Sequence, residues 1–110
     1  MKKGEIWRVA LNPVKRGGEV KRRLVLIVSG NLLNEHADTV IACPLTQKVK
    51  RFHGNLILKP DAENGLEKTS EVLTLQVMSL AKDRLKERIG AIAESEVLKV
   101  HQTLNDLLRY

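Results

Sequence analysis

The 110-residue chain has one cysteine and no long apolar run. A lone thiol cannot form a disulfide framework, which favours a reducing compartment. Cys43 lies inside an apolar strand pattern, so we interpret it as a small buried hydrophobe rather than as a reactive thiol. No apolar stretch approaches the roughly 20 residues that a membrane helix needs, and we expect no signal peptide. The length favours a single domain over residues 1–110. From the lone cysteine and the lack of a membrane helix and signal peptide, we expect a protein that is located in the cytoplasm and not associated with a membrane.

Several catalytic motifs are also missing. His36, His53 and His101 lie far apart in the sequence and no cysteine pair accompanies them, so we expect neither a metal site nor another cofactor. The chain has no Gly-Lys-Ser/Thr phosphate loop and no glycine-rich turn of the dinucleotide-binding type. Nothing marks a nucleophile elbow, although a Ser-His-Asp triad stays open.

Positive charge is concentrated in the first half of the chain. Residues 1–53 contain 11 Lys or Arg against 4 Asp or Glu, whereas residues 54–110 contain 8 against 9. The basic residues cluster in two predicted loops, as Lys15, Arg16, Lys21, Arg22 and Arg23 in one and Lys48, Lys50 and Arg51 in the other. Such patches attract phosphodiester backbones or acidic protein tails, and the alternative is a solubilising surface.

The apolar pattern predicts several short strands followed by one helix. Five consecutive apolar residues at 24–28 indicate a central strand buried on both faces. Pro44 is expected at the end or edge of its strand, because proline donates no ladder hydrogen bond. The predicted strands are 5–11, 24–28, 39–45, 55–59, 71–75 and 77–80 with a kink between them, and 88–93 with a bend at Gly90; one helical turn is expected at 32–33.

The C-terminal residues change to a helical period. Apolar residues fall near one face of this predicted helix, at Val97, Leu98, Val100, Leu104, Leu107 and Leu108. This face is expected to cap a barrel or to pack on a partner. The whole pattern predicts a mainly β fold with α (α+β), built as a small curved antiparallel barrel with a C-terminal amphipathic helix.

Two polar residues end apolar strands in a way that suits phosphate chemistry. Arg23 opens the second strand and Thr46 closes the third. Arginine offers five fixed N–H donors and keeps its charge, and threonine adds a hydroxyl that donates and accepts. If the two strands are neighbours, both groups can meet over one phosphate, as a ribonuclease requires. The alternative is that Arg23 pairs with Glu19 and that Thr46 only closes a turn.

These features together resemble the MazF/PemK toxins of type II toxin–antitoxin systems. The resemblance is carried by residues 4–9, Asn12-Pro13, the strand from Arg23 to Ser29, residues 44–48, Gly65-Leu66, Val72-Leu73, Gln76-Val77 and residues 80–85. It implies an SH3-like barrel of the CcdB/PemK type and a homodimer. It also implies metal-independent, sequence-selective cleavage of single-stranded RNA by attack of the 2′-hydroxyl, and inhibition by an antitoxin with an acidic C-terminal segment.

The resemblance assigns the catalytic positions to Arg23 and Thr46. The residues expected to bind RNA are Lys15, Arg16, Glu19, Lys48, Lys50 and His53. The chain departs from the family pattern where Leu75 stands in place of an aspartate and Met78 in place of a basic residue. A catalytically impaired module that binds RNA or antitoxin is therefore an alternative. A gyrase poison of the CcdB type is disfavoured, because the chain lacks a C-terminal Trp-Gly-Ile.

Overall fold

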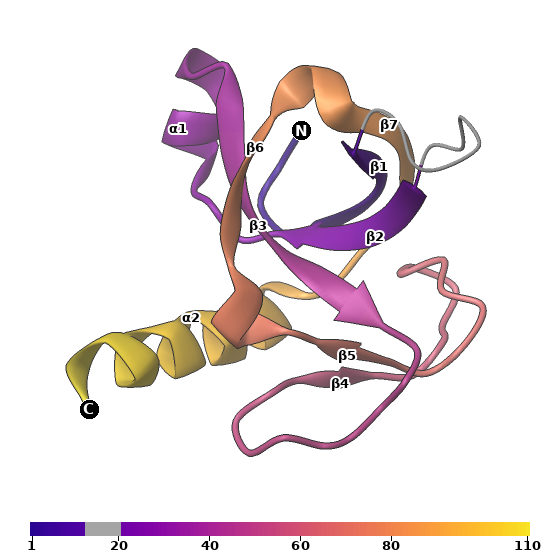
Figure 1. Ribbon diagram of the computed structural model, residues 1–110, viewed down its shortest axis with the longest axis vertical. Coiled ribbons are helices and arrows are strands. Elements are labelled where there is room, and N and C mark those ends of the chain that lie inside the picture. The colour runs from indigo at the N-terminus through magenta and orange to yellow at the C-terminus, as the bar shows by residue number, and fades with distance from the viewer. Residues whose placement is uncertain (13–20) are drawn as a thin grey trace.

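The structure, a computed structural model, describes residues 1–12 and 21–110. A curled antiparallel sheet packs against a C-terminal helix (Figure 1), which confirms the predicted fold class. The elements in chain order are β1 (Glu5–Asn12), β2 (Lys21–Ile27), α1 (Asn31–His36), β3 (Thr39–Thr46), β4 (Ile57–Leu58), β5 (Ser70–Val72), the 3₁₀ turn η2 (Thr74–Gln76), β6 (Met78–Ala81), the 3₁₀ turn η3 (Lys82–Arg84), β7 (Leu85–Ala91) and α2 (Glu94–Arg109).

Strand β3 joins the two parts of the sheet. The strand order is β4-β5-β3-β2-β1-β7, and β6 also pairs with β3. The first half of β3 pairs with β6, through Ala42 opposite Met78, and its last residues pair with β5, through Leu45 opposite Val72. Figure 1 shows β3 running from the strands around β1 and β2 down to the β4–β5 pair. The C-terminal end of β3 therefore lies where the two parts meet.

The core is divided between the two faces of the central strands. Successive side chains of a strand point to opposite faces, so Val25 and Ile27 pack with one buried cluster and Leu26 and Val28 with the other. Val25, Leu26 and Ile27 are completely buried, and burial of each such side chain contributes about 1.5–3 kcal/mol to the stability of the fold. The prediction of a central strand buried on both faces is confirmed.

Pro44 departs from its predicted position. It lies inside β3, opposite Val25, rather than at an end or an edge. Because β3 changes partner from β6 to β5 at this point, the missing N–H of proline leaves no ladder position unpaired. The carbonyl of Pro44 still accepts a hydrogen bond of 2.8 Å from the backbone N–H of Leu73.

Several element boundaries also differ from the sequence predictions. The predicted strand 55–59 is reduced to the two residues of β4, and α1 is longer than the expected single turn. β7 begins at Leu85, whereas the predicted strand begins at residue 88; the pattern misses the start because the exposed charged residues there hide the strand periodicity. The kink predicted between the strands 71–75 and 77–80 is the turn η2. A register shift in the β1–β7 pairing lies next to Gly90, where a bend was expected.

Only part of the apolar face of α2 packs against the sheet. Val97 and Val100 are buried, whereas Leu98, Leu107 and Leu108 are exposed. The amphipathic helix is therefore confirmed, but its C-terminal apolar residues have no cover within the described chain. None of the described helices is long and apolar enough to cross a membrane.

One buried carboxylate organises the loop that follows β3. Glu71 is 1% exposed, and its oxygens accept the backbone N–H groups of Lys50 (2.8 Å), Arg51 (2.9 Å) and Phe52 (3.0 Å) and the side-chain amide of Asn55 (2.9 Å). Arg51 has a φ of 56°, in the left-handed region, which turns successive N–H groups toward one anion. Burial raises the pKa of Glu71, but these four hydrogen bonds outweigh burial and hold the pKa below its ordinary value of 4.5.

We expect Glu71→Gln to destabilise the fold by about 2–4 kcal/mol at neutral pH, because an amide brings a donor against N–H donors. A lowered pKa in the folded state contributes stability that is complete above the ordinary value of 4.5 and is lost as the pH falls through the folded-state pKa. The difference in the free energy of unfolding between wild type and Glu71→Gln should therefore become smaller in acid. Urea unfolding at a series of pH values measures this difference. The exposed Glu63→Gln variant is the control, and a difference that does not change with pH would contradict the role of the ionised carboxylate.

Candidate functional site

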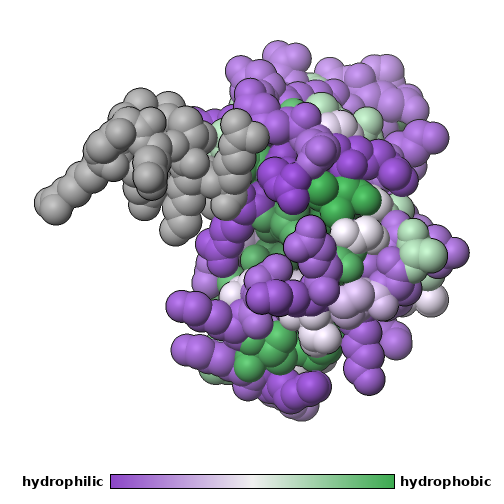
Figure 2. Space-filling model, turned by 90° about the vertical axis from the view of Figure 1, so that its right-hand side faces the viewer, coloured by the Kyte–Doolittle hydropathy of each residue, from purple (hydrophilic) through white to green (hydrophobic). Residues whose placement is uncertain are grey.

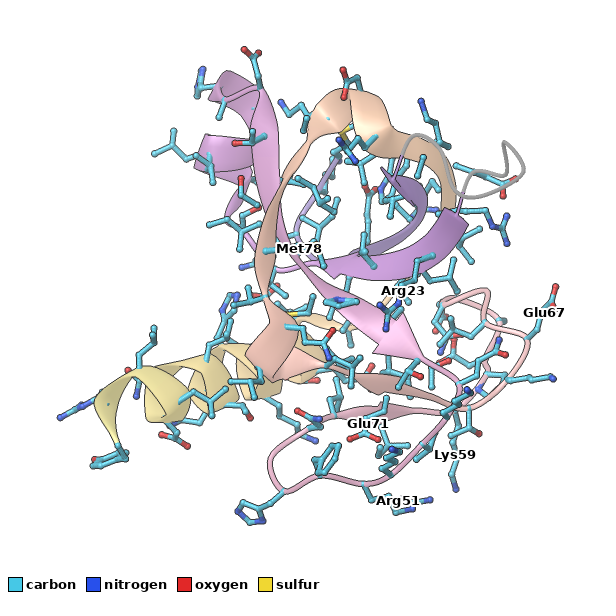
Figure 3. The ribbon with its side chains drawn as sticks, in the orientation of Figure 1. Arg23, Arg51, Lys59, Glu67, Glu71 and Met78 are labelled. Carbon is cyan, nitrogen blue, oxygen red and sulfur yellow. The ribbon has the colours of Figure 1, made fainter. Side chains whose placement is uncertain are left out.

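The structure brings Arg23 and Thr46 to the same place. β2 and β3 are antiparallel neighbours with Val25 opposite Pro44, and continuing this register by two residues places Arg23 opposite Thr46. Figure 3 shows Arg23 beside the C-terminal end of β3. A cavity of about 380 Å³ opens here, and the described residues that line it are Arg8, Arg23, Leu24, Leu45, Thr46, Gln47, Lys48 and Ser70.

The described lining of this cavity, which we call the cationic cavity, is positively charged. It includes Arg8, Arg23 and Lys48 but no aspartate or glutamate, and Leu24 and Leu45 supply apolar wall. Cations beside an apolar wall form stronger electrostatic interactions than they do in open solvent. Such a cavity is suited to hold a phosphate group through charge-assisted hydrogen bonds.

Thr46 has a local structural contact as well as a place in the cationic cavity. Its hydroxyl oxygen accepts the backbone N–H of Lys48 at 3.1 Å, so Thr46 does close a turn, as the alternative interpretation proposed. The hydroxyl proton is not used in this contact and can be donated to a ligand. Turn formation and ligand binding are therefore compatible at this residue.

The other residues predicted to bind RNA do not all meet at this cavity. Lys48 lines it, but Lys50 and His53 are not among its described lining residues. The backbone of Lys50 binds Glu71, and His53 lines a separate cavity of about 340 Å³ beside α2. In Figure 3, Arg51 lies beyond Glu71 as seen from Arg23. The predicted residues Lys15, Arg16 and Glu19 lie outside the described residues.

A second cavity extends the cationic cavity across β1 and β7. It has a volume of about 400 Å³ and shares Arg8, Leu24 and Gln47 with the first, so that the two form one groove. Its other described lining residues are Gly65, Glu67, Glu87, Arg88 and Ile89. Glu67 projects on the side of the molecule that Figure 2 shows, where a mainly hydrophilic surface surrounds small apolar areas.

Sequence reasoning missed the arginines that β1 and β7 contribute to this groove. The side chain of Arg8 forms an ion pair with Glu87, and Arg88 Nε donates to Glu5 Oε2 at 2.9 Å. The one available signal was that Arg8 interrupts the apolar residues Ile6 to Val9. Its partner is 79 residues away, which no local pattern reveals.

Within the described part of the chain, the remaining nucleophilic and metal-binding side chains are not gathered at this site. Cys43 is completely buried in the core, and burial raises the pKa of its thiol to about 12, so that the thiol stays protonated at neutral pH. His101 Nε2 lies 2.7 Å from the carbonyl oxygen of Val28 and ties α2 to the end of β2. In residues 1–12 and 21–110, no group of three or more His, Cys, Asp or Glu side chains is placed to hold a metal ion.

The two departures from the family pattern lie away from the cationic cavity. Leu75 in η2 is 79% exposed and lines the cavity beside α2. Met78 in β6 is half-buried and packs against the core cluster that contains Val25 and Ile27. Leu75 therefore provides apolar surface on the outside of the molecule, and Met78 provides apolar contact with the core.

Comparison with known families gives one match that spans nearly the whole chain. Residues 2–108 match the profile of the family described as "PemK-like, MazF-like toxin of type II toxin-antitoxin system". Endoribonuclease MazF9 of Mycobacterium tuberculosis is 25% identical, over 94% of this chain and 92% of the relative. Endoribonuclease MazF of Staphylococcus epidermidis is 26% identical, over 96% of this chain and 88% of the relative.

Solved structures share the fold at low sequence identity. A structure titled "Endoribonuclease in complex with its cognate antitoxin from Mycobacterial species" has a TM-score of 0.76 and 23% identity, covering 98% of this chain and 94% of the other. A "Mycobacterium tuberculosis toxin MazF-mt6" has a TM-score of 0.75 and 22% identity, covering 94% of this chain and 95% of the other.

Proposed function

The chain belongs to the PemK-like, MazF-like toxin family of type II toxin–antitoxin systems, and from this premise we propose that it is a metal-independent, sequence-selective endoribonuclease that cleaves single-stranded RNA. The observation that carries the proposal is the cationic cavity, which Arg23, Thr46 and Lys48 all line. Relatives named endoribonucleases, at about a quarter identity, support the same activity.

RNA supplies its own nucleophile for the proposed reaction. The 2′-oxygen forms a bond to the adjacent phosphorus and the bond from phosphorus to the 5′-oxygen breaks. One proton leaves the 2′-oxygen and one is gained by the 5′-oxygen, so that the products are a 2′,3′-cyclic phosphate and a 5′-hydroxyl. The enzyme has to align these atoms, stabilise the charge on the phosphate and allow both proton transfers.

Arg23 and Thr46 have different roles in this scheme. The guanidinium of Arg23 binds the nonbridging phosphate oxygens as negative charge increases in the transition state. Thr46 donates its hydroxyl proton to a nonbridging oxygen or holds the attacking 2′-hydroxyl. Lys48 adds a cation at the same cavity, so that the phosphate is drawn in before reaction.

The composition of the cavity supports a reaction that needs no metal. Divalent cations in proteins bind chiefly to carboxylate and carbonyl oxygens, whereas the described ionic residues of this cavity are Arg8, Arg23 and Lys48. Arg8 is balanced by its ion pair with Glu87, so the positive charge of Arg23 and Lys48 supplies the phosphate stabilisation that a metal ion would otherwise provide and disfavours binding of a metal cation.

We propose that the chain is a single-domain cytoplasmic protein, and we expect it to have two protein partners. An antitoxin with an acidic C-terminal segment would lie across the cationic cavity, as disordered acidic segments do on cationic surfaces. A second copy of the chain would cover the apolar residues left exposed beside α2, which are Phe52, Leu75, Leu98, Leu107 and Leu108. Exposed apolar patches of this kind mark association surfaces.

The wild-type protein should cleave RNA in excess chelator, and Arg23→Ala should lower the cleavage rate about 100–1000-fold with the fold intact. Arg23→Lys should restore little activity, because a point charge does not reproduce the guanidinium fork. The measurement is a gel assay of a defined RNA with analysis of the product ends and a circular dichroism control. Wild-type rates in a folded Arg23→Ala protein would rule out this assignment.

Thr46→Val removes the hydroxyl and keeps the shape of the side chain. We expect a strong loss of cleavage but a stability change below about 1 kcal/mol, because water can bind the exposed N–H of Lys48. Rates and melting temperatures of the two proteins test this directly. Retained activity with a large drop in melting temperature would show that Thr46 serves the turn alone.

The dimer should depend on the exposed apolar residues beside α2. Leu75→Asp and Leu107→Asp place a charge where each leucine is exposed, by 79% and 49% respectively, and should convert a dimer at micromolar concentration into a monomer. The control is Leu32→Asp, because Leu32 is 78% exposed but lies on α1. Sedimentation velocity measures the change, and a wild type that sediments as a monomer would refute the proposed dimer.

A further inference from the structure

The side chain of Glu71 lies on the same face of the sheet as the side chain of Thr46. The two residues are opposite each other in the β3–β5 pair, and directly opposite residues of an antiparallel pair point their side chains to the same face. In Figure 3, Glu71 and Arg23 lie on either side of the C-terminal end of β3. A buried carboxylate therefore stands next to the strand end that carries the proposed catalytic threonine.

Glu71 is not placed to act as a general base. Its side chain is buried, at 1% exposure, and its two oxygens already accept four N–H groups. It is also absent from the described lining of the cationic cavity. A general base has to reach the proton that it removes, directly or through one water. Glu71 can therefore act on a reaction only through the loop that it binds.

Two anchors hold the short segment of residues 47–49. Thr46 is fixed by its pairing in the sheet, and the backbone N–H of Lys50 donates to Glu71 Oε1 at 2.8 Å. Lys48 is the middle residue of this segment, and its N–H donates to the hydroxyl oxygen of Thr46 at 3.1 Å. Because so short a segment has few conformations once both ends are fixed, Glu71 determines where Lys48 lies and how the Thr46 hydroxyl is engaged.

The far end of the same loop has anchors of its own. The hydroxyl of Thr103 in α2 donates to the carbonyl oxygen of Gly54 at 2.7 Å, and the backbone N–H of Asn55 donates to the carbonyl oxygen of Phe52 at 3.1 Å. Neither bond uses the carboxylate of Glu71. Loss of this carboxylate should therefore release the residues around Lys48 more than those beside α2.

We infer that Glu71 is a positioning residue for RNA cleavage: by binding the loop backbone, its carboxylate places the Thr46 hydroxyl and the Lys48 ammonium at the cationic cavity. The inference rests on the proposed function. Without the carboxylate, three loop N–H groups lose their acceptor, and the loop has to move to bring them to water. A misplacement of about 1 Å in a site can lower a rate about 100-fold.

The test is chemical rescue of Glu71→Ala by acetate. The substitution removes a methylene and a carboxylate, and acetate has nearly this size and carries the same charge. We expect kcat/KM for a defined RNA to fall about 100-fold and to recover in a saturable way with acetate, but not with chloride at the same ionic strength. Circular dichroism at the assay temperature checks that the variant is folded. An unchanged kcat/KM in folded Glu71→Ala, or a loss that acetate does not relieve, would overturn the inference.

Control variants separate positioning from stability and from direct catalysis. Val72 follows Glu71 in β5, but its side chain packs in the core, so Val72→Ala should lower stability through a cavity and leave kcat/KM unchanged. An equal loss of kcat/KM in Val72→Ala would assign the effect to stability and contradict positioning. Arg23→Ala should lose activity that acetate does not restore, because the missing group is a cation.

Glu71→Gln provides a second variant of the same position. Its amide fills the place of the carboxylate, so we expect a loss of kcat/KM that acetate does not relieve. This variant also decides the matter if Glu71→Ala does not fold. A folded Glu71→Gln protein that cleaves RNA with the wild-type kcat/KM would then overturn the inference.

Amide resonances separate the inference from the activity. In isotope-labelled Glu71→Ala, acetate should return the three loop N–H resonances toward their wild-type positions, and those of Thr46 and Lys48 with them. This result would support the positioning of both residues even if the wild type cut no RNA and the proposed function had failed. Acetate that restores the loop resonances but leaves Thr46 and Lys48 unchanged would overturn the inference, whether or not the protein cuts RNA.

Discussion

The buried carboxylate of Glu71 is the interaction on which the shape of the candidate site depends. Glu71 is the β5 residue opposite Thr46 in the sheet, and its oxygens bind the backbone of Lys50, Arg51 and Phe52. One side chain therefore holds the loop that contains these basic residues beside the strand that ends in Thr46. A buried anion is costly without partners, and here backbone N–H groups stabilise it. The cationic side chains of the loop are left available to a ligand.

The change of partner in β3 has a similar consequence for the backbone. Because β3 pairs first with β6 and then with β5, its C-terminal end lies between β2 and the β4–β5 pair. Arg23 reaches that point from β2, Ser70 from β5, and Arg8 from β1 opposite Leu24. A sheet that continued flat would not bring these strands around one cavity. Curvature of the sheet, allowed at Pro44 without loss of a hydrogen bond, is what assembles the groove.

The elements that sequence reasoning predicted well are those whose signal is local. β2, β3 and α2 are marked by continuous or periodic apolar residues, and the meeting of Arg23 with Thr46 needed only one further assumption, that their strands are neighbours. Glu71 and Arg8 had no comparable signal. A glutamate that opens a strand reads as a surface residue, and its burial depends on a loop about 20 residues earlier. Arg8 finds Glu87 only through the β1–β7 pairing, which tertiary structure alone creates.

The substitutions at Leu75 and Met78 agree with a groove whose ionic groups come from other strands. Met78 packs in the core and Leu75 is exposed beside α2, so neither places charge at the cationic cavity. Two arginines on β1 and β7 instead extend the groove away from Arg23, each oriented by a glutamate. An arginine held in this way keeps its charge and most of its donors, and it loses less conformational freedom when a ligand binds. The described ionic groups of the groove thus come from β1, β2, β7 and the loops after β3 and before β5, and none of them depends on position 75 or 78.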